Sequence, residues 1–190
     1  MTSKLEWTYK LFIERWQQSG IIVAVRGLLR PLATAIHRFY LNKVWGMHIG
    51  EDCQISLSAK MDKTNPSGIY IGDRTAVSFN ASVMSHDYTR RLRVDTCIGK
   101  ECQIGAHSLI FPGVTIGDNC IVAPASVVMK DVPPNCLVAG NPARVMEKGI
   151  RTGRWGILLD KLEDKPANAT EAADAAENAD DQRRTAQRSD

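Results

Sequence analysis

The side chains best suited to acid–base chemistry in this chain are its four histidines, at positions 37, 48, 86 and 107. An imidazole, whose ordinary pKa is about 6.5, can take up or release a proton near neutral pH. His86 differs from the others because it opens a polar segment, DYTRRLRVDTC, in which Arg90, Arg91 and Arg93 can meet an anionic ligand or form a solvated surface. His86 is therefore our candidate for a side chain that accepts or releases a proton in a reaction.

The elements that would position His86 are predicted from a repeat of six residues. An aliphatic side chain recurs in steps of six over three runs, Ile49–Met61, Ile71–Val83 and Ile98–Val128. Glycine follows the aliphatic residue directly at positions 50, 72, 99, 105 and 117. A small or compact residue, such as Cys53 or Ala81, stands four places after it. Regularity at so many positions indicates a repeated structural unit.

Strand alternation explains this spacing. The small residue and the aliphatic residue two places later lie on the same, inward side of a strand, as in Cys102 and Ile104. We expect the glycine after the aliphatic residue to allow unusual φ and ψ at a corner. Short strands with a corner every six residues predict an all-β solenoid of parallel coils. Cys53, Cys102 and Cys120 fill the small inward position, so we assign them to the core and not to a reactive site.

Two segments break the period. Asp62–Tyr70 is polar and rich in turn-forming residues, and it predicts a bulge. After Val83 the phase of the repeat would bury Asp87, and burying a lone carboxylate is costly. We therefore expect residues 87–97 to project as a loop, and loops on a rigid scaffold often carry binding and catalytic residues.

The phase of the repeat also predicts the direction of His86. It stands three places after Val83, a position that faces away from the inward residues, at the mouth of the predicted loop. Asn80 and His107 have the same outward phase, so each can contribute to a site or form ordinary surface. His37 and His48 are expected to be structural.

The repeat resembles that of the hexapeptide-repeat acyltransferases, which fold as left-handed parallel β-helices with three sides and usually assemble as trimers. Residues 138–145, VAGNPARV, are similar to the closing segment of that family, and Ser85-His86-Asp87 resembles the start of the loop that carries its catalytic histidine. The resemblance covers about residues 46–150. It implies an acetyl-CoA-dependent O-acetyltransferase of the sugar or polysaccharide branch, with His86 as base and direct transfer from acetyl-CoA to the acceptor.

The resemblance also implies where the two substrates bind. Near His86 it favours Asn80, Asp87 and Arg90 as acceptor-binding residues. In this family the CoA arm lies in a groove between two subunits and is held largely by backbone groups of the later coils. The candidates for that role are Gly105, Ala106, Ala123, Lys130 and Arg144, of which the two cations suit phosphate groups.

Other activities share the predicted fold, because a fold alone does not define an activity. N-acetylation of an amino sugar and a non-catalytic scaffold are open alternatives. Serine is a less favoured acceptor, since the large N-terminal helical domain expected of that branch is missing. The γ-class carbonic anhydrases bind zinc through three histidines, two of them close together, whereas His48, His86 and His107 are 38 and 21 residues apart. We therefore expect no metal.

Composition limits the remaining classes. The chain has 190 residues, of which 44% are hydrophobic, 24% charged and 6% aromatic, as in one globular domain with appendages. Residues 1–160 contain 19 basic and 13 acidic residues, a balance that suits anionic ligands but is too weak to predict nucleic-acid binding. The five cysteines form no CxxC pair, and their odd number favours a reducing cytoplasm over a disulfide framework.

Four regions are predicted along the chain. Residues 1–45 form an N-terminal helical arm, and residues 46–139 form the β-helix with its loop. Residues 140–160 form the closing segment. Residues 161–190, rich in Ala, Asp, Glu and Asn, predict a disordered tail.

The arm has two interpretations. Residues 5–45 are basic and amphipathic, so they can contact an anionic membrane from its cytoplasmic face, or they can cap the first coil or pack within a trimer. The start of the chain is charged and lacks the apolar run of a signal peptide, which agrees with the expected cytoplasmic location.

Overall fold

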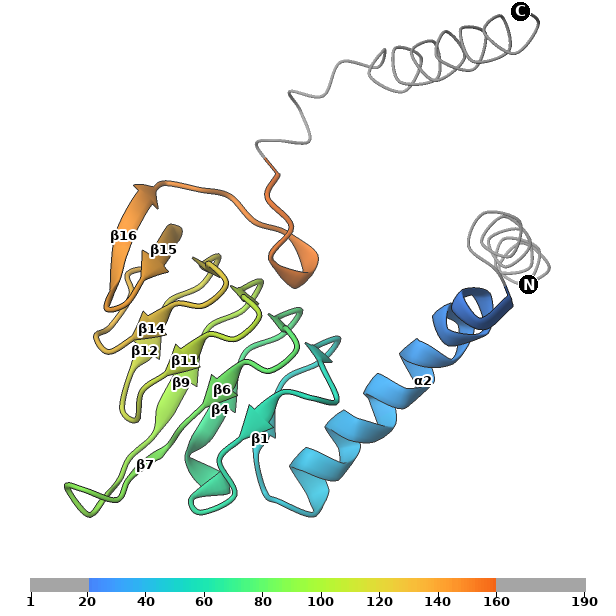
Figure 1. Cartoon of the computed structure of the whole chain (residues 1–190), viewed down its shortest axis with the longest axis horizontal. Coiled ribbons are helices and arrows are strands. Elements are labelled where there is room, and N and C mark those ends of the chain that lie inside the picture. Colours follow the sequence, from blue (N-terminus) through green and yellow to red (C-terminus); the bar gives the residue numbers. More distant parts are fainter. Residues whose placement is uncertain (1–20, 160–190) are drawn as a thin grey trace, which may run out of the picture. The chain divides into compact units, whose positions relative to one another are not determined.

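The computed structural model describes residues 21–159 of the chain (Figure 1). The predictions for residues 1–20 and 161–190, which include the first part of the arm and the disordered tail, lie outside the described residues. The chain divides into two units, Met1–Ile157 and Leu158–Asp190. The first unit contains all the helices and strands described below.

Short parallel strands form three sheets, here named A, B and C. Sheet A contains β1 (His48–Ile49), β4 (Ile69–Ile71), β9 (Thr96–Ile98) and β12 (Thr115–Ile116). Sheet B contains β2 (Gln54–Ile55), β5 (Ala76–Val77), β10 (Gln103–Ile104), β13 (Ile121–Val122), β15 (Cys136–Gly140) and the antiparallel β16 (Ala143–Lys148). Sheet C contains β3 (Lys60–Met61), β6 (Ser82–Val83), β11 (Leu109–Ile110) and β14 (Val127–Val128).

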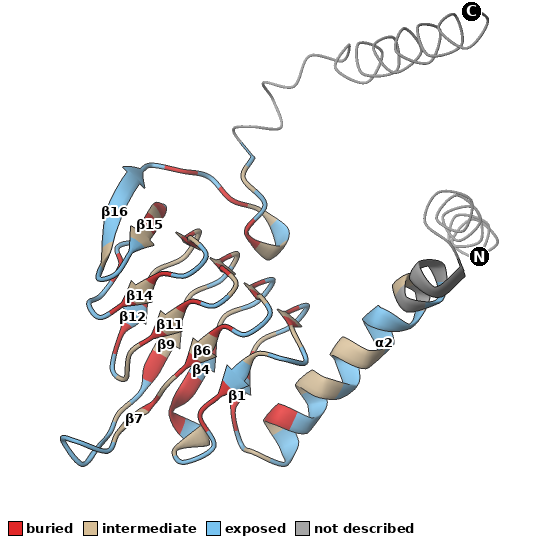
Figure 2. Cartoon of the chain, viewed as in Figure 1, coloured by how far each residue is buried: buried red, intermediate tan, exposed pale blue. Residues whose placement is uncertain are grey.

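Consecutive strands enter sheets A, B and C in rotation, so the chain winds as a three-sided coil of parallel strands (Figure 1). Equivalent aliphatic residues lie above one another, since Ile49 pairs with Ile71 and Ile71 pairs with Ile98. These residues are buried, whereas the residue before each of them is exposed or half-buried (Figure 2). The period of six and the inward direction of its aliphatic residues are confirmed.

The coil has three corners, each named after the sheets that it joins. The AB corner follows β1, β4, β9 and β12, and the BC corner follows β2, β5, β10 and β13. The CA corner follows β3, β6, β11 and β14.

The small inward residues also lie in the core. Cys53, Cys102 and Cys120 are at most 6% exposed, and the Cys102 thiol donates to Gly117 O at 3.1 Å. Burial raises the pKa of the Cys53 thiol, which keeps it protonated and unreactive. The assignment of these cysteines to packing agrees with their burial.

The glycines after the aliphatic residues serve a different purpose from the one expected. The expectation of unusual φ at these positions is wrong, because positive φ occurs instead three places after the aliphatic residue, as at Arg74 and Asn80 (φ 55°). A Cβ on Gly99 would lie 2.7 Å from the backbone nitrogen of Asp118 in the next coil. Glycine is required there because adjacent coils approach closely.

The two breaks in the period differ in form. The first contains a short 3-10 helix, η1 (Pro66–Gly68), and β4 begins directly after it. The second is an antiparallel hairpin of β7 (His86–Asp87) and β8 (Leu92–Arg93), which projects from the coil (Figure 1). It is shorter than the predicted loop, because β9 already includes Thr96. This residue is fully buried, and its hydroxyl donates to Met84 O at 2.6 Å, which closes the coil again.

The helix α2 (Ile21–Lys43) leads into the first coil. Asn42 exchanges two hydrogen bonds with the backbone of Ile49, at 2.8 and 3.0 Å, and Arg38 donates to Gly50 O at 2.8 Å. The last turns of α2 therefore contact the start of the coil. Within residues 21–159, no helix combines the length and hydropathy needed to cross a membrane.

At the other end, β15 and β16 form a hairpin that contains residues 140–148 of the predicted closing segment. The following strap, Ile150–Ile157, runs back along the AB corner and includes η2 (Arg154–Gly156). Its Thr152 hydroxyl donates to Glu101 O at 2.7 Å, and the backbone N–H of Trp155 donates to Arg74 O at 2.6 Å. The strap thus connects successive coils.

Candidate active site

His86 lies at the CA corner, where β6 ends and the β7–β8 hairpin begins. The preceding Ser85 is fully buried. Its hydroxyl donates to Asn65 O at 2.5 Å, and its carbonyl accepts from Asn65 Nδ2 at 3.0 Å. These bonds fix the base of the hairpin to the preceding coil. The His86 side chain is 26% exposed, so its ring lies at the surface of the coil.

A carboxylate from the preceding coil holds the His86 ring. Asp62 follows β3 directly, and its side chain is 3% exposed. Asp62 Oδ2 accepts the backbone N–H groups of Ser85 and His86, each at 2.9 Å, and also hydrogen-bonds His86 Nδ1. Asp62 Oδ1 accepts the N–H of Thr64 at 2.8 Å. The same carboxylate therefore fixes both the backbone and the ring of His86.

These hydrogen bonds set the charge of Asp62. Burial alone raises the pKa of this carboxyl, but the bonds from Ser85 N–H, the His86 ring and Thr64 N–H outweigh burial and lower its pKa to about 2. An ionised carboxylate can only accept, so His86 Nδ1 carries the proton in their hydrogen bond.

The fixed proton position leaves the other ring nitrogen available. Nε2 of a neutral His86 is then a proton acceptor, and no residue between 21 and 159 hydrogen-bonds it. A histidine oriented by a carboxylate through Nδ1, with Nε2 open, has the geometry of a general base.

The hairpin carries two further predicted residues. Asp87 Oδ1 accepts the N–H of Arg90 at 3.0 Å, and Asp87 Oδ2 lies 3.6 Å from Arg90 Nε. The Arg90 side chain is 75% exposed, and Arg91 and Arg93 are exposed beside it. The structure therefore brings His86, Asp87 and Arg90 together in one hairpin.

The residues predicted from later coils gather elsewhere. Asn80 is exposed at the BC corner, which also carries Gly105, Ala106 and Ala123. In this stack, Gly105 N–H donates to Val122 O and Ala106 O accepts from Ala125, both at 2.8 Å. His107 lies at the same corner, edge-on to Phe79 with 5.3 Å between ring centroids. Within one chain, these residues therefore lie at a different corner from His86.

The two phosphate-binding candidates lie apart. Lys130 follows β14 and is exposed at the CA corner, two coils beyond His86. Arg144 is exposed on β16, which belongs to sheet B. Within one chain, only Lys130 shares a corner with the candidate base.

Asp62 is the site residue that the sequence-based prediction missed. The residue fell in the break that was predicted to form a bulge, and it received no role. The available signal is the register between coils, because Met61 pairs with Val83. A residue one place after Met61 must therefore lie beside the start of Ser85-His86, and a carboxylate there can reach the ring.

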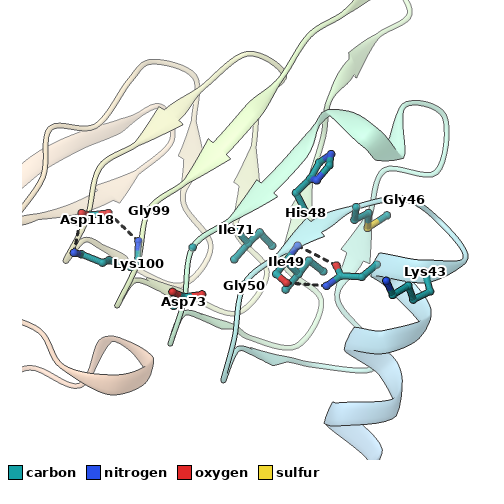
Figure 3. A pocket seen from close by; sticks show the side chains of 13 residues that line it. Lys43, Gly46, His48, Ile49, Gly50, Ile71, Asp73, Gly99, Lys100 and Asp118 are labelled. Atoms are coloured by element: carbon teal, nitrogen blue, oxygen red, sulfur yellow. Dashed lines mark hydrogen bonds and ion pairs between the residues drawn. The ribbon is translucent and has the colours of Figure 1, made fainter.

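A pocket of about 790 Å³ lies at the opposite edge of sheet A, along the AB corner (Figure 3). It is lined by 13 residues that include Gly50, Gly72, Gly99, Lys100 and Asp118. Its histidine, His48, stacks on the Tyr70 ring with 4.4 Å between centroids and not on a carboxylate. The pocket contains none of the predicted site residues, so we place the candidate active site at the CA corner.

The arrangement of the histidines also bears on metal binding. His48 lies on sheet A, His86 at the CA corner and His107 at the BC corner. Across the described residues, 21–159, no three or more His, Cys, Asp or Glu side chains are grouped as metal ligands.

The described residues thus form a three-sided coil of six-residue units, with one oriented histidine at a corner. Residues 96–128 match the family model described as the hexapeptide repeat of succinyl-transferase. Over this segment, the chain is similar to the hexapeptide-repeat acyltransferases.

Individual relatives cover part of the chain. Galactoside O-acetyltransferase of Escherichia coli strain K12 is 36% identical over 113 residues, which are 54% of each protein. YvoF of Bacillus subtilis, which is named only provisionally as an acetyltransferase, is 35% identical over 102 residues, 53% of this chain and 59% of its own.

Among solved structures, a maltose O-acetyltransferase from Clostridium difficile 630 aligns with a TM-score of 0.48 and 26% identity, over 58% of this chain and 73% of its own. The chain spans about half the length of the curated relatives it matches. We therefore propose, below, the activity, the acceptor and the assembly of this chain.

Proposed function

We propose that this protein is an acetyl-CoA-dependent O-acetyltransferase that modifies a hydroxyl group of a sugar or polysaccharide precursor. The observation that carries the proposal is the Asp62–His86 pair at the CA corner, with Nδ1 held by a buried carboxylate and Nε2 open. The sugar acceptor is supported by the similarity to galactoside O-acetyltransferase.

The proposed reaction is a single direct transfer. His86 Nε2 removes the proton of the acceptor hydroxyl as its oxygen attacks the thioester carbonyl of acetyl-CoA. The tetrahedral intermediate collapses, the carbon–sulfur bond breaks, and the CoA sulfur takes the proton back from His86. Asp62 stabilises the imidazolium that exists between these two proton transfers, because its charge is close to Nδ1.

A homotrimer would complete this site. Within one chain the candidates Asn80, Gly105, Ala106 and Ala123 lie at the BC corner, and His86 lies at the CA corner. We propose that the CA corner of one subunit faces the BC corner of its neighbour, with the CoA arm in the groove between them. Lys130 and Arg144 would bind the phosphates of CoA, and Asn80, Asp87 and Arg90 would contact the acceptor.

The family also supports a left-handed winding of the three-sided coil, which we include in the proposal. A cytoplasmic location is supported by the cysteines, because all five are free within the described coil and four of them are buried.

The proposal is tested by incubating the purified full chain with acetyl-CoA and a panel of sugars, amino sugars and serine, and by following the release of free thiol. We expect turnover with a sugar hydroxyl and a loss of about 10²- to 10⁴-fold in the His86→Ala variant. His48→Ala is the matched control, since His48 packs against Tyr70 on sheet A, and it should keep its activity.

Three results would contradict this assignment. Full turnover in a folded His86→Ala variant would exclude the histidine base. Transfer to an amino group alone would make the protein an N-acetyltransferase, and failure to bind CoA in a calorimetric titration would favour a non-catalytic scaffold.

A further inference from the structure

The helix α2 carries an apolar face that the rest of the described chain leaves uncovered. Val25, Leu29, Leu32, Ile36 and Phe39 follow one another in steps of four and three residues, which places them on one side of the helix. Their exposures are 41%, 55%, 61%, 60% and 64%. Figure 2 shows the same contrast, with exposed and half-buried residues along α2 and one buried position near its end.

The other side of α2 meets the coil. Leu41 is buried there, and Arg38 donates to Gly50 O. A groove between α2 and the coil is lined from the helix by Arg30 and Thr34, which are not part of the apolar face. Leu29 and Phe39 also border grooves beside the coil, yet both stay more than half exposed, so the coil does not cover the apolar face.

The charge of α2 indicates what does cover them. Ile21–Lys43 contains four cations, Arg26, Arg30, Arg38 and Lys43, and no Asp or Glu. A second copy of the helix would add four like charges to the contact. Residues 1–20 contain three basic and two acidic residues, so they too bring a net positive charge. An anionic lipid surface supplies negative charge, which neither a second copy of α2 nor residues 1–20 can supply as a net charge.

We propose that α2 is a docking face for an anionic membrane surface. Its apolar residues enter the boundary between headgroups and acyl chains, as expected for a basic amphipathic helix. Lys43 is exposed and stands four residues after Phe39, and its long stem allows the ammonium group to reach lipid phosphates while the apolar face is buried. This inference does not depend on the proposed acetyl transfer.

The test is vesicle flotation of the purified full chain. We expect binding to vesicles of equal parts phosphatidylcholine and phosphatidylglycerol to be at least about tenfold tighter than binding to phosphatidylcholine alone, and to weaken as salt is added. The double variant Leu32→Asp, Ile36→Asp should lose about 100-fold in affinity, because two charges enter the apolar face. Lys43→Gln should lose about fivefold.

Leu57→Asp is the matched control, since Leu57 is an equally prominent leucine of the coil, 67% exposed and outside α2. It should bind vesicles like the wild type. Circular dichroism of each variant establishes that α2 and the coil are folded.

Three results would overturn the inference. Folded wild-type protein that ignores anionic vesicles, or that binds neutral vesicles equally well, would exclude a charge-selected lipid surface. A lower oligomeric mass of the double variant in sedimentation, without vesicle binding by the wild type, would show that a second copy covers the face. Vesicle binding that appears only after deletion of residues 2–20 would show that this segment covers it.

Discussion

The AB and CA corners of the same coil are built in opposite ways. At the AB corner the strap Ile150–Ile157 covers successive turns, and its Thr152 and Trp155 donate to the carbonyls of Glu101 and Arg74. At the CA corner the chain leaves the coil as the β7–β8 hairpin. The first corner is closed by hydrogen bonds to its backbone, and the second is opened to solvent.

Each corner also carries a carboxylate with a different partner. At the AB corner Asp52 is exposed and receives two hydrogen bonds from Arg154, at 2.5 and 2.6 Å. At the CA corner Asp62 is buried and receives three backbone N–H groups and the His86 ring. An exposed ion pair contributes little free energy, whereas a buried acceptor with all its bonds made fixes geometry. The comparison indicates that the strap stabilises the AB corner, whereas the CA corner carries the proposed chemistry.

The largest effect that this comparison predicts is the loss of acetyl transfer in the Asp62→Asn variant. An amide can donate to His86 Nδ1, which would move the ring proton to Nε2 and remove the base. We expect acetyl transfer to fall by about 10²- to 10⁴-fold, with a smaller change in the Michaelis constant for acetyl-CoA. The measurement is the steady-state rate of thiol release across a pH series.

Asp52→Asn is the matched control for this prediction, because it changes a carboxylate of the same coil without touching His86. It should keep the wild-type rate. If both variants lost activity equally, the loss would come from the coil as a whole and the separation between the two corners would be wrong.

The fold was predictable from the sequence because one pattern repeats many times. Each six-residue unit places its aliphatic residue inward by strand alternation, so Ile55, Ile104 and Ile110 are fully buried as predicted. The reason for glycine was not predictable in the same way. The crowding at Gly99 comes from Asp118 in the next coil, and contacts between coils are absent from the local sequence.

The site was predictable only in part. His86 was chosen as a candidate because it interrupts a regular pattern, and an interruption is visible along the chain. Asp62 lies 24 residues before it and meets it through the register of β3 and β6, which a linear reading does not supply. The grouping of Asn80 and Gly105 at another corner was hidden for the same reason, since residues in phase with one another can lie on different corners.

A change in the strap should affect stability alone. Gly156 has φ 68°, and a Cβ there would lie 2.5 Å from the backbone nitrogen of Gln103. We expect Gly156→Ala to lower the free energy of unfolding by about 2–4 kcal/mol, because the strap must shift away from the AB corner. Denaturant unfolding measures this change, and the rate of acetyl transfer in the folded variant should stay within about twofold of the wild type.

Gly149→Ala provides the control for this prediction. Gly149 also has a positive φ, 77°, but no atom lies within 4 Å of its Cβ position. It should lose only about 1 kcal/mol, from backbone strain alone. Equal losses in the two variants would mean that contact with Gln103 does not matter and that the strap does not hold the corner.

The smallest expected effect concerns pH and distinguishes the two carboxylates. The pKa of Asp62 falls to about 2 in the folded chain, from an ordinary value of about 3.9, so its ionised form stabilises the fold. That contribution is present above about pH 4 and is lost as the pH falls through about 2, with about 2 kcal/mol lost between pH 5 and pH 2. The pKa of Asp52 is also lowered, by the hydrogen bonds of Arg154, but that pair is exposed and screened by solvent.

Denaturant unfolding between about pH 5 and pH 2 should therefore show a shallower loss of stability in Asp62→Asn than in the wild type, while Asp52→Asn follows the wild type. A shallower curve in Asp52→Asn instead would assign the acid sensitivity to the strapped corner.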